Sequence, residues 1–149
     1  DTDRSRGLGD VYKRQLYAQL EVADKINDRR LAIWDKYYEG LKELKDEGKI
    51  ELQVIPEGCK HNAHMFFMKA KDLQERTELI KYLKENEIQT VFHYIPLHTA
   101  PAGIKYGRFH GEDRYTTKES ERLMRLPMHY ALTDEDVECV IEKIKEFYK

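Results

Sequence analysis

The spacing of apolar residues constrains this chain more than any other feature of its sequence. Between Leu16 and Leu44 apolar side chains recur at spacings of three, four and seven, which is typical of one face of a long amphipathic helix ending near Gly48. The residues that share this face are Leu16, Leu20, Ala23, Ile26, Ile33, Trp34, Tyr37, Leu41 and Leu44. The pattern then alternates in IELQVIP (50–56), which predicts a strand that stops at its proline.

The middle of the chain predicts two more strands with a helix between them. After a turn in GCKHNA (58–63), the mostly apolar HMFFMKA (64–70) predicts a second strand. Asp72, with a glutamate three residues later, resembles a capping box and opens a helix that ends near Asn86. QTVFHYI (89–95) predicts a third strand, which is closed by the next proline.

The last third of the chain predicts a long loop, two helices and a short extended piece. Residues 96–116 predict a loop rich in aromatic and histidine side chains, and loops of this length are usually functional or disordered. Thr117 opens a helix, and RLPMHY (125–130) predicts a short strand or extended turn. Thr133 caps a last helix, because acidic residues fill its first turn. The buried face of that helix is expected to hold Val137, Val140, Ile141, Ile144 and Phe147, with Cys139 also in the core.

This order of elements predicts an α+β domain, in which helices cover a small, mainly antiparallel sheet. The two early strands are joined by a short turn and should therefore pair antiparallel. Neither a G-x-G-x-x-G motif after a strand nor a Walker motif is present, so a doubly wound nucleotide fold is not indicated. The formal net charge of −2, without a basic block, gives no indication of a nucleic-acid partner.

Other compositional features bear on where such a chain works. It has no run of eighteen apolar residues, so we expect no membrane span, and its first ten residues lack the apolar core of a signal peptide. The two cysteines, Cys59 and Cys139, have neither disulfide nor zinc spacing. Both observations favour the reducing environment of the cytoplasm.

The first fifteen residues differ from the rest. DTDRSRGLGDVYKRQ (1–15) has no apolar period, and its segment GLGDVYKRQ resembles translated sequencing-adapter sequence. We therefore expect residues 1–15 to be a non-native leader or a linker, and residues 16–149 to form the domain.

The candidate site is VFHYIPLH (91–98), where two histidines and a tyrosine follow the third predicted strand. A metal site would need three or four converging ligands. The available pairs, His61 with His64 and His93 with His98, lack structural-zinc spacing. A nucleophilic Cys59 would need a base and an orienting group, and only His61 lies nearby in the sequence. We therefore predict neither a metal site nor a catalytic residue in this chain.

A third interpretation treats these side chains as walls of a pocket. His93, Tyr94, His98 and His64 offer hydrogen-bonding groups together with flat apolar faces, which suit sugar hydroxyls, nucleobases and phosphates. The alternative is that His93 has only a structural role, as a strand residue whose side chain lies on the face opposite to those of Phe92 and Tyr94. His129 is expected either to lie on the surface or to have its ring nitrogens hydrogen-bonded within the protein.

Four segments together resemble a known family. NAHMFF (62–67), VFHYIPLH (91–98), GEDRYTTKESERLMRLP (111–127) and LTDEDVECVIEKI (132–144) are similar to the C-terminal part of the DegT/DnrJ/StrS sugar aminotransferases. The resemblance runs from Leu16 to Lys149. HY-x-P-x-H is widespread in that family, and the third segment is the more specific signature.

The resemblance implies a small C-terminal domain of a fold-type-I enzyme that uses pyridoxal 5'-phosphate. In such enzymes a large domain holds the cofactor and its catalytic lysine, and none of its motifs is found here. The resemblance further implies a homodimer that moves an amino group from glutamate to a dTDP-4-keto-6-deoxyhexose, in the synthesis of enterobacterial common antigen and other polysaccharides. His93, Tyr94, His98 and His64 would then bind substrate, without cofactor ligands in this chain. The alternative is a stand-alone domain that binds a small ligand or a partner.

Overall fold

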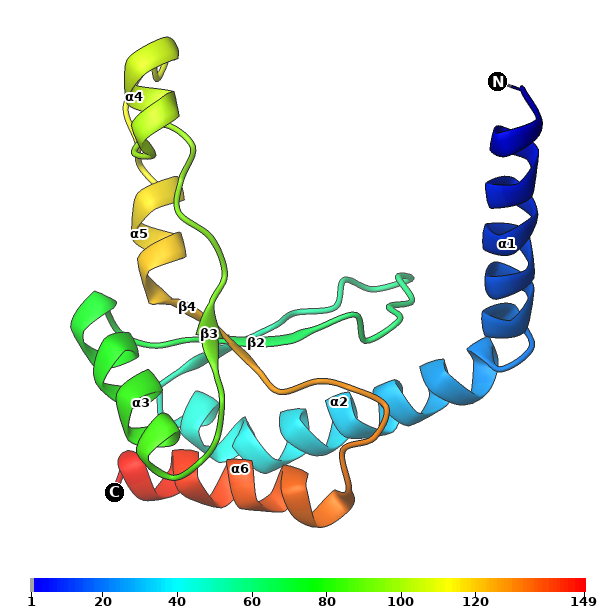
Figure 1. The fold of residues 1–149 in the computed structure, drawn as a ribbon. Helices are drawn as coiled ribbons and strands as arrows, with labels where there is room; N and C mark the ends of the chain where they lie inside the picture. The colour runs from blue at the N-terminus through cyan, green and yellow to red at the C-terminus, as the bar shows by residue number, and fades with distance from the viewer. Residues whose placement is uncertain (1) are drawn as a thin grey trace.

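The computed structural model describes the backbone of residues 2–149 and the side chains of residues 9–149 (Figure 1). Its helices are α1 (Thr2–Leu20), α2 (Ala23–Asp46), α3 (Leu73–Glu85), α4 (Pro101–Tyr106), α5 (Thr116–Arg122) and α6 (Asp134–Phe147). Its strands are β1 (Glu51–Leu52), β2 (Phe66–Lys69), β3 (Val91–Phe92) and β4 (Leu123–Leu126). Helices and a small sheet therefore make up the α+β domain that the sequence predicts.

The four strands form one antiparallel sheet in the order β1-β2-β4-β3. The predicted antiparallel pairing of the two early strands is confirmed, with Leu52 opposite Met68. The late strand β4 lies between β2 and β3, and Phe66 and Met68 pair with Leu126 and Met124. These four paired residues share one face of the sheet, since directly opposed side chains point the same way.

That face is the floor of the hydrophobic core. Figure 1 shows α2 and α6 side by side beneath the sheet, with α3 beside them. The largest fully buried side chains come from all of these elements: Tyr37, Phe66, Ile33, Leu41, Met68, Leu79, Leu83, Met124, Ile144 and Val137. Tyr37 satisfies its buried hydroxyl by donating to the carbonyl of Pro127 at 3.1 Å, and burial raises the pKa of this phenol far above its ordinary value.

Two of the three core helices begin at the caps that the sequence predicts. The Asp72 carboxylate accepts from the backbone N–H of Glu75, although the Glu75 side chain returns to the N–H of Lys71 rather than to that of Asp72. Thr133 and Asp136 form the complete reciprocal capping box at α6. These bonds satisfy helix N–H groups that would otherwise have no partner.

The predicted single helix from Leu16 to Gly48 is interrupted. Val22 has φ −115° and ψ 6°, and this break separates α1 from α2. The predicted apolar face is buried from Ile33 onward, whereas Leu16 and Leu20 of α1 are 56% and 62% exposed. Figure 1 shows α1 pointing away from the sheet. Residues 2–15 lie in α1, and the rest of the predicted leader, Asp1, lies outside the described residues.

Two strands are shorter than predicted, and the long loop is not uniform. β1 and β3 contain only two residues each, because β1 pairs along Glu51–Leu52 and β3 along Val91–Phe92. The predicted loop 96–116 contains the short helix α4. This helix lies so close to the preceding chain that a Cβ on Gly103 would come within 1.6 Å of the Leu97 carbonyl oxygen, so only glycine fits there.

The prediction that Cys139 is a core residue is wrong. Val137, Val140, Ile141 and Ile144 form the buried side of α6, and Cys139 is two positions from Val137, on the exposed side. His129 is exposed, which agrees with one of its two expected environments. Within the described residues, no helix is both long and apolar enough to cross a membrane.

Candidate functional site

Residues 93–115, here called the arm, leave the sheet after β3 and return to it through α5 and β4. Figure 1 shows the arm extending away from α2 and α6, with α4 at its far end. Its large apolar side chains mostly face outward, and the exposed ones are Tyr94, Ile95, Leu97, Ile104, Tyr106, Phe109 and Tyr115. The arm therefore presents apolar and aromatic groups that the core of this domain does not use.

His98 is the most firmly held of the predicted site residues. Its Nε2 lies 2.8 Å from Oδ2 of Asp113, and its ring packs on Phe109 with the ring centroids 4.5 Å apart. The Asp113 carboxylate also accepts from the hydroxyl and the backbone N–H of Thr117 in α5. These bonds, first that from the Thr117 hydroxyl and then those from the Thr117 N–H and His98, hold the pKa of Asp113 below its ordinary value.

An ionised carboxylate only accepts hydrogen bonds, so Nε2 of His98 carries a hydrogen. In the neutral ring Nδ1 is then the acceptor. The side chains of His98 and Asp113 are 20% and 21% exposed, so the pair is partly shielded from water. Asp113 thus orients the imidazole of His98, which can accept a hydrogen bond from a ligand through Nδ1. The same hydrogen bond also joins the two ends of the arm.

His93 and Tyr94 lie at the root of the arm. Their rings meet edge to face with the centroids 5.1 Å apart, and Tyr94 is 49% exposed. The Nδ1 of His93 is buried and has no hydrogen-bonding partner. A buried polar atom without a partner is unfavourable, and in native structures such an atom often marks a place where a ligand or water binds.

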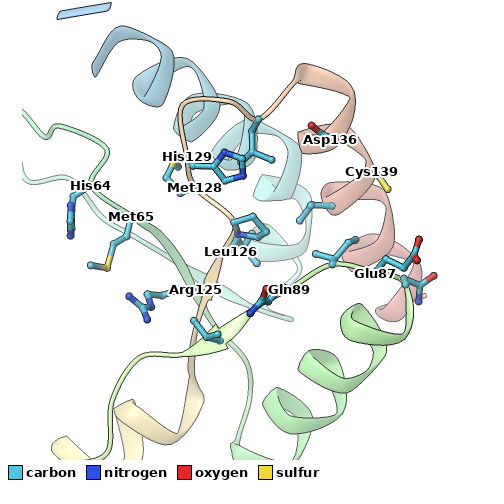
Figure 2. A pocket seen from close by; sticks show the side chains of 16 residues that line it. His64, Met65, Glu87, Gln89, Arg125, Leu126, Met128, His129, Asp136 and Cys139 are labelled. Atoms are coloured by element: carbon cyan, nitrogen blue, oxygen red, sulfur yellow. The ribbon is translucent and has the colours of Figure 1, made fainter. Parts of the chain in front are cut away.

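His64 lies apart from the arm, just before β2. Its backbone is held because Arg30 of α2 donates to the carbonyls of both Ala63 and His64. Ala63 has a φ of +47°, a conformation that is uncommon for a residue with a side chain. The exposed imidazole lines an open pocket of about 800 Å³, which Figure 2 shows in close-up.

Four parts of the chain form this pocket: the segment just before β2, the turn that leads into β3, the end of β4 with the connection to α6, and α6 itself. Its polar side chains include His64, Arg125, His129 and Gln89, together with the acids Glu87 and Asp136. Cys139 stands at one margin of it (Figure 2). The pocket is lined by His64 but not by His93, Tyr94 or His98, so the four predicted residues occupy two separate places.

Arg125, Gln89 and Glu87 are not among the site residues that the sequence predicts. One signal was present: in RLMRLP (122–127) Arg125 stands between two apolar residues of a predicted extended segment, which places it on the face opposite to theirs. No such signal marks Gln89 and Glu87, because they reach the pocket through the pairing of β3 with the distant β4.

Within the described residues, the geometry indicates neither a metal centre nor a cysteine nucleophile. Among the residues that the structure describes, no group of three or more His, Cys, Asp or Glu side chains is placed to hold a metal ion. His61 packs its ring on Trp34, 4.4 Å between centroids, and its Nδ1 accepts from the N–H of Ala63. Cys59 is exposed, in a turn.

Comparison with known proteins identifies the class. Residues 15–145 match the DegT/DnrJ/EryC1/StrS aminotransferase family. A pleiotropic regulatory protein of Geobacillus stearothermophilus is 33% identical over 107 residues, which cover 71% of this chain and 29% of that protein. The dTDP-3-amino-3,4,6-trideoxy-alpha-D-glucose transaminase of Micromonospora megalomicea subsp. nigra is 28% identical over 141 residues, which cover 93% of this chain and 37% of the transaminase.

Solved structures share the fold. The aminotransferase TlmJ from Streptoalloteichus hindustanus superimposes with a TM-score of 0.77 at 25% identity, covering 89% of this chain and 34% of TlmJ. A putative sugar aminotransferase from Streptococcus pneumoniae, Spr1654, was solved in its PMP form and superimposes with a TM-score of 0.72 at 25% identity. This second match covers 88% of this chain and 33% of Spr1654.

The chain therefore belongs to the DegT/DnrJ/EryC1/StrS aminotransferase family. It spans about a third of the length of the relatives that it matches. The α+β fold matches one part of these aminotransferase structures, as the sequence resemblance implies.

Proposed function

We propose that residues 16–149 form the C-terminal small domain of an enzyme that transfers an amino group to a nucleotide sugar with the help of pyridoxal phosphate. The family match over residues 15–145 carries this proposal. The proposal includes the prediction that residues 1–15 are a leader or linker. The exposure of every side chain from Asp10 to Leu20 supports this part of the proposal.

The pocket that contains His64 and Arg125 does not fit an anchoring site for the cofactor. Such a site needs a lysine for the imine bond and partners for the pyridine nitrogen and the phosphate. Among the described residues, no lysine lines the pocket that contains His64. Lys69 is engaged by Glu51 and Glu119 at 3.1 and 2.7 Å. We therefore propose that the cofactor is bound by a large domain outside this chain.

For the substrates we propose glutamate as the amino donor and a dTDP-4-keto-6-deoxyhexose as the acceptor. The segment GEDRYTTKESERLMRLP (111–127) supports this choice, since it resembles dTDP-4-amino-4,6-dideoxygalactose transaminase of enterobacterial common antigen synthesis. The Micromonospora relative named above is also a dTDP-sugar transaminase. We place the reaction in the cytoplasm, because exposed free thiols at Cys59 and Cys139 suit a reducing compartment.

The role proposed for this domain is to form part of the substrate pocket. His93 offers a buried Nδ1 that has no partner, and His98 is an imidazole oriented by Asp113. Tyr94 and His64 are exposed hydrogen-bonding groups beside apolar surface. The outward-facing apolar side chains of the arm would pack against the large domain or against the second subunit of a homodimer.

The decisive experiment is to sequence the DNA upstream of Leu16 and to express the whole reading frame. We expect this reading frame to encode a longer polypeptide. That polypeptide should convert glutamate and a dTDP-4-keto-6-deoxyhexose into 2-oxoglutarate and a dTDP-amino sugar, and mass spectrometry of the sugar nucleotide measures the product. The 149-residue chain, mixed with pyridoxal phosphate and treated with borohydride, should not gain a stoichiometric lysine adduct. Labelling of one lysine, or a start codon next to Leu16, would contradict the proposal.

A further inference from the structure

The guanidinium of Arg125 has no partner among the described residues. Arg125 lies on the outer face of β4, between the buried Met124 and Leu126. The residues opposite it on the neighbouring strands are Phe67 of β2 and Val91 of β3, and neither can accept a hydrogen bond through its side chain. Its Nε is buried without a hydrogen-bonding partner.

The lack of hydrogen-bonding partners is particular to Arg125, because the nearby Arg122 has several. Arg122 donates to the carboxylates of Glu51 and Glu119 and to the carbonyl of Ala70, so its guanidinium is fully engaged. Those two acids also bind Lys69, and the four side chains form a closed ionic network. A buried donor without a partner is costly.

Arg125 faces a space large enough for a ligand. It lines the 800 Å³ pocket together with the imidazoles of His64 and His129. Figure 2 shows its side chain extending toward the side where His64 and Met65 lie, whereas Glu87 stands at the opposite margin. Neither Glu87 nor Asp136 forms an ion pair with Arg125 in the described part of the chain, and Asp136 already accepts from the N–H of Thr133.

We propose that Arg125 anchors an oxyanion ligand, a carboxylate or a phosphate, in this pocket. A planar guanidinium binds such groups through two parallel hydrogen bonds from neighbouring nitrogens. His64 and His129 would add further donors at the rim. The source of the anion rests on the proposed function: glutamate would offer a carboxylate, and the dTDP-sugar would offer a diphosphate.

The direct test uses the chain itself and needs no variant. The Nε–H of Arg125 gives its own nitrogen–proton NMR signal, and burial protects it from rapid exchange. Sodium glutamate, sodium phosphate and dTDP are titrated separately at constant ionic strength, with sodium chloride as the reference. Arg76 is the internal control, because its Nε is also buried without a partner but lies outside this pocket.

We expect the Arg125 signal to shift and saturate with at least one of these anions, while the Arg76 signal stays in place. Saturation at a lower concentration of glutamate would identify the carboxylate as the source, and saturation at a lower concentration of dTDP would identify the diphosphate. Arg125→Gln should weaken that binding at least about tenfold, since hydrogen bonds to charged groups are the strong ones. Arg114→Gln, which removes an exposed charge elsewhere, should leave it unchanged.

An Arg125 signal that responds no more than in chloride, or that moves together with that of Arg76, would overturn the proposal. These outcomes are independent of the transamination assay. A longer enzyme could be active while Arg125 ignores all three anions, and the chain could bind an anion even if the proposed acceptor sugar were wrong.

Discussion

Large apolar side chains are buried in the body of the domain, whereas in the arm they face outward. Leu83 of α3 is fully buried, and Leu97 of the arm is 84% exposed. The body is held by α2, α3 and α6 packed against the sheet, but the arm is held by polar bonds such as that between His98 and Asp113 and by the close approach at Gly103. The difference teaches that global stability and local order should respond to different substitutions, because regions with few buried contacts open locally.

The largest effect is expected from a matched pair of leucines. Leu83→Ala should lower the free energy of unfolding by roughly 2–5 kcal/mol, because it removes buried methyl groups and leaves a cavity. Leu97→Ala should change it by less than about 0.5 kcal/mol, since exposed substitutions are usually neutral. Urea denaturation followed by circular dichroism measures both. Equal losses would show that the arm belongs to the same cooperative core as α3.

A smaller effect is expected at the start of α6. Thr133→Ala removes the side-chain acceptor of the capping box and should cost about 1 kcal/mol of stability. Thr116→Ala is the control, because Thr116 begins α5, whose N-cap makes no side-chain hydrogen bond. The same denaturation experiment applies. If Thr116→Ala were the more harmful change, α5 rather than α6 would be the helix whose start limits stability.

In the arm, His98→Ala should act locally. Loss of the bond to Asp113 should increase hydrogen exchange of amides in residues 97–117 by an amount equivalent to about 0.5–1.5 kcal/mol, while exchange in α6 stays unchanged. In the longer enzyme the same variant should lower kcat/KM roughly tenfold. His110→Ala, an exposed histidine of the same arm, should do neither. A uniform rise in exchange throughout the body would show instead that His98 supports the core.

The smallest expected effect depends on pH. Because the folded-state pKa of Asp113 lies below its usual 3.8, ionised Asp113 stabilises the folded arm above that value. The contribution is lost as the pH falls through the lower folded-state pKa. The amide signal of Thr117 should therefore titrate below pH 3.8 in the NMR spectrum. Asp113→Asn should remove this titration, and Glu112→Gln should not. Persistence of the transition in Asp113→Asn would assign it to another carboxyl.

What the sequence could predict was local. The caps at Asp72 and Thr133 and the buried stripe of α6 follow from spacing alone, and the structure confirms them. The break at Glu21–Val22 could not be predicted, because no glycine or proline marks it. Cys139 was misplaced because its residue type was given more weight than its position on α6.

The candidate site was less predictable than the fold, because it depends on contacts between distant residues. The bond from His98 to Asp113 spans fifteen positions, and nothing in the motif VFHYIPLH indicates it. Arg125 and His64 line the same pocket, because β2 pairs with β4. Local patterns identify residues with useful chemistry, but only the strand order determines which of them become neighbours.

The position of β4 also has a consequence for how the chain is made. Strand β4 begins at Leu123 and yet lies between β2 and β3, so β3 has no partner in the sheet until the ribosome has passed that residue. The β1–β2 pair can form much earlier, since its last residue is Lys69. During translation, the exposed edge of β2 must therefore wait while more than fifty residues are added, from position 69 to position 123, and β3 must wait while about thirty are added, from position 92 to position 123. Unpaired edges of this kind are open to wrong partners, so slow synthesis in this interval should favour aggregation of the nascent chain.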